Sequence, residues 1–316
     1  MQNTPETRIA GAGLVTCLGA SREATLAAVK AGSRVQGEPF SFMAGTPHGA
    51  CLAAREQEPD LRGRVADRHM RKFMSRQAEL AAAAARQALE EADLPARGIA
   101  PARIGLYAGV GLAAMDITAS ARLLRACLDE NGSFSLSRFS RDGLRTIHPL
   151  WSFHTLANMP ACIVSVLEGI EGDNGIYTPW EDQTAFALLE AAYALHDGVI
   201  DAAVVVAADT PSHPASMAEL ASCGFIAPGE VVAPGAACLV LERADTSAPA
   251  RPFSRLGGLR LMASAAEDAP CDDPLAPIIG RTVAAAPLLL VILAPLLGLP
   301  CRLRGCGGHD FSFEAT

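Results

Sequence analysis

Short runs of apolar residues alternate along this chain with longer segments in which apolar and polar positions are mixed. The continuous apolar runs predict strands that are buried on both faces. They lie at residues 8–15, 103–110, 201–208 and 236–242. The mixed segments, rich in good helix formers, predict helices at residues 22–31, 66–93 and 183–196. Because strands and helices alternate, the sequence predicts an α/β protein with helices on both faces of a sheet.

Three further stretches interrupt this alternation. Residues 133–156 mix Ser, Arg, Asp and Pro and predict irregular structure. Residues 244–280 are rich in Pro, Ala and Asp, with weak periodicity, and predict a linker or a shortened domain half. Residues 283–300 are strongly apolar, but they contain three prolines and are barely long enough to span a membrane. We interpret them as a buried core helix.

Composition narrows the class further. The chain has 316 residues, of which 50% are hydrophobic and only 5% aromatic, so helices packed on a sheet are favoured over an aromatic-rich β-sandwich. A formal net charge of −8 argues against a nucleic-acid partner, which would require a positive face. One basic segment, residues 62–76, is either a solvated helix and loop face or a dock for an acidic carrier protein.

The nine cysteines are scattered, without a CxxC pair or the spacing of a metal site. They predict reduced thiols in a cytoplasmic protein, an expectation that the N-terminus supports because it lacks a secretory signal. The glycines of residues 11–19 do not form a dinucleotide-binding motif. We therefore expect no cofactor, no metal and no membrane partner.

Four segments in order resemble the β-ketoacyl synthase family of fatty-acid and polyketide synthesis. The first is RIAGAGLVTCLGASREATLAAVKAG, residues 8–32, and the second is Asp67-Arg68 with the alanine-rich helix and IGLYAGVG after it. The third is Asn158-Met159-Pro160-Ala161, followed by Gly169 and Gly172. The fourth comprises DGVIDAAVVVAAD, PGAACLVLE and Gly305-Cys306-Gly307-Gly308-His309.

The resemblance implies a thiolase-like αβαβα layered fold with a shortened C-terminal half. It divides the chain into a ketosynthase-like N-terminal half, residues 1–243, and a truncated C-terminal half, residues 244–316. It also implies dimerisation through a strand next to the active site.

The family's nucleophilic cysteine lies at a strand-to-helix elbow, where the helix N-terminus favours the thiolate. Counting from the motifs on either side places Glu181 at that position, and a shift of one residue would place Asp182 there. A carboxylate is a poor nucleophile toward thioesters, so ordinary condensation is not expected. The family's Gly-His pair matches Gly280-Arg281, and its second histidine has no counterpart.

The resemblance thus implies degenerate positions at Glu181 and Arg281 and no catalytic residue. We hypothesise that these two side chains form an ion pair. Glu181 is otherwise interpreted as a helix N-cap or first-turn acid favoured by the helix dipole, as a catalytic acid or base, or as a charge that shapes a partner's pocket.

The remaining candidates have structural interpretations. Gly305, Cys306, Gly307 and Gly308 match the family's glycine-rich loop, where Cys306 is expected to fill a small gap. Cys162 lies in an apolar stretch and is expected in the core. Three histidines lack the spacing of a triad or metal site and are expected to be structural: His148, His154 and His213.

A synthase-like chain without these catalytic groups resembles the chain length factors of type II polyketide synthases, including aryl polyene and other highly reducing systems. The resemblance implies a catalytically silent partner that forms a heterodimer with an active ketosynthase and bounds its acyl tunnel. An acyl carrier protein with a phosphopantetheine-bound chain would be the second partner. The alternatives are a malonyl-carrier decarboxylase or acyltransferase that uses Glu181, and a scaffold that only stabilises its ketosynthase.

Tunnel length in such partners depends on side-chain bulk near the interface. The resemblance places the tunnel wall just after the second core strand, at Leu112, Ala113, Met115 and Asp116. The small Ala113 and Ala114 would permit a longer chain, and Met115 is the expected stopper.

Overall fold

The computed structural model describes residues 4–54, 70–112, 117–227, 229–244, 255–264 and 271–315. Its main sheet has the strand order β10-β11-β9-β1-β8-β6-β4-β5. The strands are β1 (Thr7–Val15), β4 (Ile104–Val110), β5 (Asn174–Tyr177), β6 (Ala202–Asp209), β8 (Gly235–Arg243), β9 (Arg255–Ala263), β10 (Arg302–Arg304) and β11 (His309–Ala315).

The centre of this sheet consists of the apolar runs predicted as strands. β4 and β6 are buried along their whole length and pair in parallel, and β4 also pairs in parallel with β5. β8 is antiparallel to β6, and β1 is antiparallel to β8. The carboxyl ends of the parallel strands β4, β5 and β6 therefore lie side by side, and the residues that follow these strands meet at one end of the sheet.

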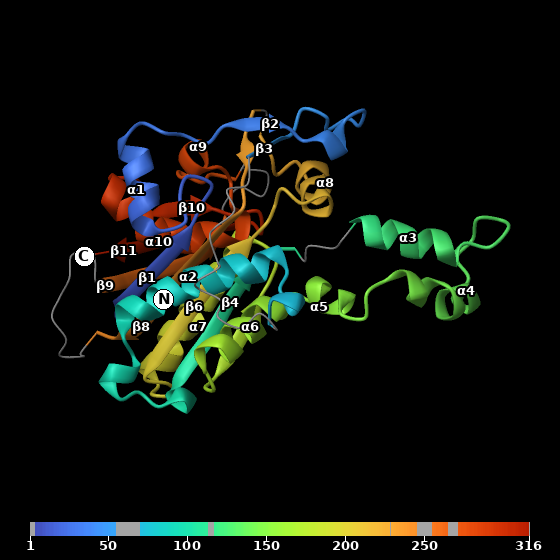
Figure 1. Cartoon of the computed structure of the whole chain (residues 1–316). Helices are drawn as coiled ribbons and strands as arrows, with labels where there is room; N and C mark the ends of the chain where they lie inside the picture. The colour runs from blue at the N-terminus through green and yellow to red at the C-terminus, as the bar shows by residue number, and fades with distance from the viewer. Residues whose placement is uncertain are drawn as a thin grey trace.

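Helices cover both faces of this part of the sheet (Figure 1). The helices α2 (Arg76–Ala92) and α6 (Met159–Glu168) pack on one face. The helices α7 (Glu181–His196) and α10 (Ala286–Leu297) pack on the other face.

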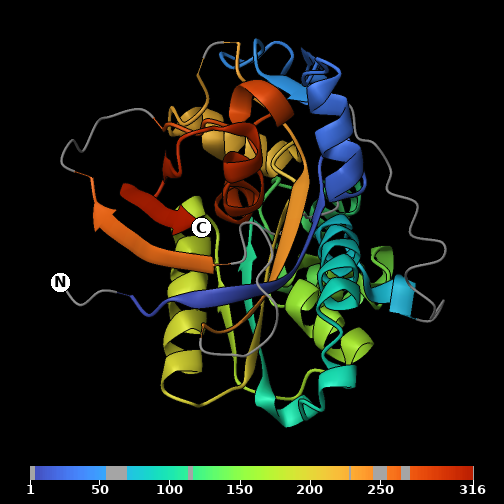
Figure 2. The same ribbon diagram turned by 90° about the vertical axis from the view of Figure 1, so that its left-hand side faces the viewer.

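The strands β9 and β11 cover the far side of α7 and α10, because their Leu256, Leu259, Phe311 and Phe313 share one core cluster with these helices. β9 joins β1 only at its start, where Arg255 and Leu256 pair with Arg8 and Thr7, and it then curves away from the sheet centre (Figure 2). Because the main sheet curves at β9, its two parts form separate layers, and the described elements follow the order helix, strands, helix, strands, which matches the first four layers of the expected αβαβα arrangement.

The remaining elements lie around this body. A second sheet contains β2 (Gly37–Pro39), β3 (Leu52–Ala54) and β7 (Val231–Val232). The other α-helices are α1 (Arg22–Lys30), α3 (Ile117–Cys127), α4 (Leu136–Arg141), α5 (Trp151–Thr155), α8 (Pro214–Ser222) and α9 (Ala276–Ile279). The described residues also form the short 3-10 helices η1 (Ser41–Met43), η2 (Met70–Phe73), η3 (Pro95–Arg97), η4 (Pro101–Arg103), η5 (Gly143–Thr146) and η6 (Val283–Ala285). Figure 1 shows α3 and α4 projecting away from the body.

Several predicted boundaries were wrong. The helix expected over residues 66–93 begins only at Arg76, because the Ser75 hydroxyl accepts the Ala78 N–H and caps it. Residues 133–156 contain the helices α4, η5 and α5 rather than irregular structure.

The stretch interpreted as a linker or shortened half, residues 244–280, contributes β9 to the main sheet. The apolar stretch after it forms the buried helix α10, as predicted. Within the described ranges, none of the helices combines the length and apolar character needed to cross a membrane. The proposed division of the chain between residues 243 and 244 stays a prediction.

Glycines let β1 lie directly on α2. A Cβ on Gly13 would clash with the backbone carbonyl of Ala84 and would lie 2.6 Å from the Cβ of Gln87. We expect Gly13→Ala to lower the free energy of unfolding by roughly 1–3 kcal/mol in urea denaturation, because the backbones must separate. Gly257→Ala is the control, since its Cβ would lie in ordinary van der Waals contact, 3.5 Å from Cγ of Glu6. Equal stability of the two variants would contradict this packing argument.

Candidate functional site

The first turn of α7 carries an acidic side chain that is almost completely buried. β5 ends at Tyr177, and after a short elbow α7 begins at Glu181, which is 1% exposed. Backbone N–H groups in the first turn of a helix lack intrahelical partners, and the helix dipole favours negative charge there. The predicted strand-to-helix elbow is therefore present, with Glu181 as its first helical residue.

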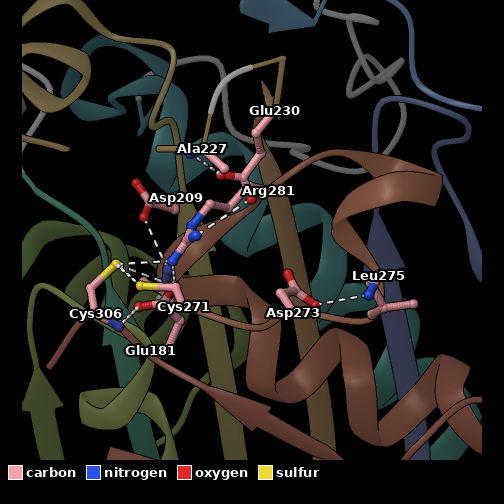
Figure 3. Close-up of polar contacts among 10 residues, drawn as sticks. Glu181, Asp209, Ala227, Glu230, Cys271, Asp273, Leu275, Arg281 and Cys306 are labelled. Carbon is pink, nitrogen blue, oxygen red and sulfur yellow. Dashed lines mark hydrogen bonds and ion pairs between the residues drawn. The ribbon is translucent and has the colours of Figure 1, made fainter. Parts of the chain in front are cut away.

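Glu181 forms the ion pair that the sequence predicted. Its Oε1 lies 2.9 Å from Nη2 of Arg281, which is 2% exposed (Figure 3). The other terminal nitrogen of the same guanidinium, Nη1, lies 3.4 Å from Oε1 of Glu230. Burial alone would lower the pKa of Arg281, but the nearby negative groups, Glu181 foremost, raise it.

Backbone pairing fixes the position of this guanidinium. The Arg281 N–H donates to the Val231 carbonyl over 2.8 Å, and its own carbonyl accepts the Ala233 N–H over 2.9 Å. Gly280 precedes it with φ +82°, a backbone conformation that residues with a Cβ rarely adopt. The short helix α9 and β7 therefore hold Arg281 over the start of α7.

The predicted glycine-rich loop, residues 305–308, closes the other side of Glu181. The backbone N–H of Cys306 donates to Oε2 of Glu181 over 3.0 Å. A Cβ on Gly305 would lie 2.9 Å from the Cβ of Glu181, and one on Gly307 would clash with the Asp182 carboxylate. The loop needs glycines here because its backbone lies against the first turn of α7.

Asp182 faces a different partner from Glu181. Its Oδ2 lies 3.0 Å from Nδ1 of His309, the residue that begins β11. The alternative register, with Asp182 opposite Arg281, therefore does not describe the structure. The contact between Asp182 and His309 was not predicted from the sequence, although both residues lie in segments that resemble family motifs.

Two thiols complete the polar cluster. Sγ of Cys306 accepts from Nη2 of Arg281 over 3.0 Å and lies 3.4 Å from Sγ of Cys271. The hydrogen bond with Cys306 lowers the pKa of Cys271 to about 7, assisted by the charge of Arg281 and opposed by burial. The interpretation of Cys306 as a gap filler was therefore incomplete, and no pattern in the sequence had singled out Cys271.

Two further carboxyl groups are buried beside this cluster (Figure 3). Asp209, the last residue of β6, accepts the Ala284 N–H over 3.1 Å, and burial raises its pKa to about 8. Asp273 accepts the Leu275 N–H over 2.9 Å, and burial raises its pKa to about 7. Burial disfavours the charged form of both carboxyl groups.

Of the predicted tunnel residues, Leu112 alone falls in the described part of the chain. It is partly buried, and its carbonyl accepts from the Gln77 side chain over 2.8 Å. Ala113, Ala114, Met115 and Asp116 lie outside the described residues. Most of the basic segment, residues 62–69, also lies outside them.

The three histidines singled out from the sequence, and Cys162, lie away from Glu181. His148 and His213 accept backbone N–H groups two residues ahead of them, and His154 contacts the Lys72 carbonyl, so each has a local structural contact. The expectation of a core position for Cys162 was wrong, because it is exposed. The helix α6 buries Pro160, Ala161, Ile163 and Val164. Cys162 lies on its exposed face.

The match to a known family covers most of the chain. The model of the β-ketoacyl synthase N-terminal domain matches residues 33–247. A search of curated protein sequences finds no match. The family match confirms the predicted resemblance.

Solved structures share the fold at low sequence identity. A type II polyketide synthase acyl-carrier protein in complex with its ketosynthase bound to the hexaketide matches with a TM-score of 0.72 and 14% identity, covering 99% of this chain and 100% of that chain. The ishigamide ketosynthase/chain length factor matches with a TM-score of 0.61 and 18% identity, covering 94% and 79%. A ketosynthase in complex with its chain length factor from Xenorhabdus doucetiae matches with a TM-score of 0.57 and 13% identity, covering 94% and 69%. These matches confirm the thiolase-like ketosynthase fold.

Proposed function

Since the chain belongs to the β-ketoacyl synthase family, we propose that it is a catalytically silent partner of an active ketosynthase, a chain length factor that forms a heterodimer and bounds the acyl tunnel. The observation that carries this proposal is the engaged carboxylate at the helix start. Glu181 occupies the elbow between β5 and α7, and its two oxygens contact Arg281 and the Cys306 N–H.

This arrangement disfavours acyl loading at Glu181. A carboxylate is a weak nucleophile toward a thioester, and the anhydride it would form does not persist as a thioester does. Here the carboxylate is also 1% exposed and held by a buried cation. A substrate would have to displace both partners before it could reach an oxygen.

The alternative function, decarboxylation or acyl transfer with Glu181, receives no support from this geometry. Decarboxylation of a malonyl thioester requires donors for the developing enolate oxygen. The backbone N–H of Cys306, which the glycine-rich loop places against the first turn of α7, already donates to Glu181. A general base, in turn, needs a free oxygen directed at its substrate.

An outer strand of the main sheet and exposed apolar side chains support a protein partner. β5 is the outer strand of the described main sheet, beside β4, and a partner strand would extend the sheet there. The projecting helices α3 and α4, with the turn between them, expose large apolar side chains that a monomer would normally cover. These side chains are Leu124, Leu128, Phe134 and Leu136.

The proposed tunnel wall agrees with the strand order. Residues 112–116 follow β4, and Glu181 follows β5, which is parallel to β4. Ligands of open parallel sheets bind beyond the carboxyl ends of the strands. The positions proposed to bound the acyl chain remain 112, 113, 115 and 116, with Met115 as the stopper. An acyl carrier protein would present that chain.

We expect the isolated chain to release no acetyl-carrier from malonyl-carrier above the uncatalysed background, by mass spectrometry of the carrier. Mixed with its ketosynthase, it should elute as a heterodimer and support condensation that depends on the ketosynthase's cysteine. Glu181→Gln, which keeps the shape of the side chain, should leave the isolated chain equally inactive.

Decarboxylation by the isolated wild-type chain that Glu181→Gln abolishes would instead establish the enzymatic alternative. A folded chain that fails to bind any co-encoded ketosynthase would contradict the partner function. Circular dichroism of each sample separates these outcomes from misfolding.

A further inference from the structure

Two free thiols from separate segments meet beside Arg281. Cys271 lies between β9 and α9, and Cys306 lies in the turn between β10 and β11. Asp272 and Arg304 join the two segments through reciprocal backbone hydrogen bonds of 3.0 and 2.9 Å. This bridge holds the sulfur atoms 3.4 Å apart, so a small movement would bring them to bonding distance.

The surroundings favour a thiolate at Cys271. The hydrogen bond between the two sulfur atoms and the positive charge of Arg281 lower the pKa of Cys271, whereas burial and the charge of Glu181 oppose this shift. Arg304, across the backbone bridge, is a second nearby cation. A pKa near 7 makes a thiol both substantially ionised and still strongly nucleophilic at neutral pH.

Exposure assigns different roles to the two sulfurs. Cys271 is partly exposed, whereas Cys306, within the glycine-rich loop, is buried and only 9% exposed. A small reagent therefore reaches Cys271 first. We propose that Cys271 and Cys306 form a peroxide-reactive dithiol, in which Cys271 attacks the hydroperoxide and Cys306 resolves the product as a disulfide.

This proposal goes beyond the partner function and depends on no partner chain. In the first step the Cys271 thiolate attacks the terminal oxygen of the hydroperoxide, the O–O bond breaks, and the released alkoxide takes a proton to leave as an alcohol. In the second step the Cys306 sulfur attacks Sγ of the Cys271 sulfenic acid. Hydroxide leaves and takes the Cys306 proton as water.

The net change is two thiols and one hydroperoxide to one disulfide, one alcohol and one water. A dithiol reductant reverses it by supplying two hydrogens. The disulfide would fasten the glycine-rich loop to the segment before α9. That loop donates the Cys306 N–H to Glu181, so oxidation would rigidify one wall of the elbow site.

The test uses the full chain, treated with hydrogen peroxide, alkylated and digested with trypsin without reduction. Cys271 and Cys306 fall in the tryptic peptides 261–281 and 305–316, and Cys301 falls in 282–302, so the linkage is unambiguous. We expect the first two peptides to be cross-linked and to separate after treatment with dithiothreitol.

Two variants assign the roles. In Cys306→Ser, dimedone should label Cys271 as a sulfenic acid roughly tenfold faster than the exposed Cys162 at pH 7. In Cys271→Ser, Cys306 should stay unlabelled. The proposal fails if the cross-linked pair is absent while Cys162 is oxidised, or if Cys271 is labelled no faster than Cys162. Circular dichroism confirms that each variant is folded.

Discussion

Arg281→Met should lower the free energy of unfolding by about 3–5 kcal/mol, the typical cost of removing one partner from a buried ion pair. Methionine roughly preserves the apolar stem but removes the cation between Glu181 and Glu230. Glu181 is 1% exposed and would remain without its counter-charge, because the Cys306 N–H is a neutral donor. Urea denaturation of the variant and the wild type measures the difference.

The double variant Glu181→Gln with Arg281→Met should recover most of this loss, because it removes the uncompensated charge. Arg141→Met is the matched control, since Arg141 pairs with Asp142 on the exposed surface and should contribute little. If the double variant is no more stable than Arg281→Met alone, the loss comes from packing rather than from the stranded carboxylate.

The ion pair between Glu181 and Arg281 was predictable because each residue occupies a position that can be aligned with a family motif. Glu181 follows from the spacing of the flanking strands, and Arg281 follows from the glycine before the apolar helix. The two positions are 100 residues apart, so no local pattern could have joined them. The family resemblance supplied that long-range link, and the structure confirms the pairing at 2.9 Å.

Cys271 could not be found in the same way. Its position depends on the backbone bridge between Asp272 and Arg304. The strand on one side of that bridge, β10, has only three residues, too few to show an alternating pattern. The other side lies in the Pro- and Asp-rich stretch that resembled a linker.

β9 was missed for a related reason. Leu256, Leu259 and Leu261 contribute apolar side chains to the core, but Gly257 and Gly258 interrupt the expected alternation. Gly258 has φ +56°, and the pairing with β11 shifts register nearby. By contrast, the start of α2 carried a readable signal, because Ser75 is a typical N-cap residue.

The second large effect is a pH-dependent stability that comes from Asp209. Burial raises the pKa of this carboxyl group in the folded protein to about 8, and the charge of Glu181 adds to it. In the unfolded chain the pKa of an aspartate is about 3.9. Between about pH 4 and pH 8 the folded state keeps a proton that the unfolded state releases, so rising pH must destabilise the folded state.

Asp209→Asn removes this titration while keeping an oxygen for the Ala284 N–H. We therefore expect the stability of the wild type, relative to the variant, to fall with a slope of up to about 1.4 kcal/mol per pH unit as the pH rises. The decline should level off above about pH 8, and urea denaturation at several pH values measures it. Asp273 titrates in both proteins and largely cancels in the comparison. A difference that stays constant with pH would mean that Asp209 is ionised in the folded protein, which would require stabilisation beyond the hydrogen bonds from the Ala284 and Thr210 N–H groups and the Gln77 side chain.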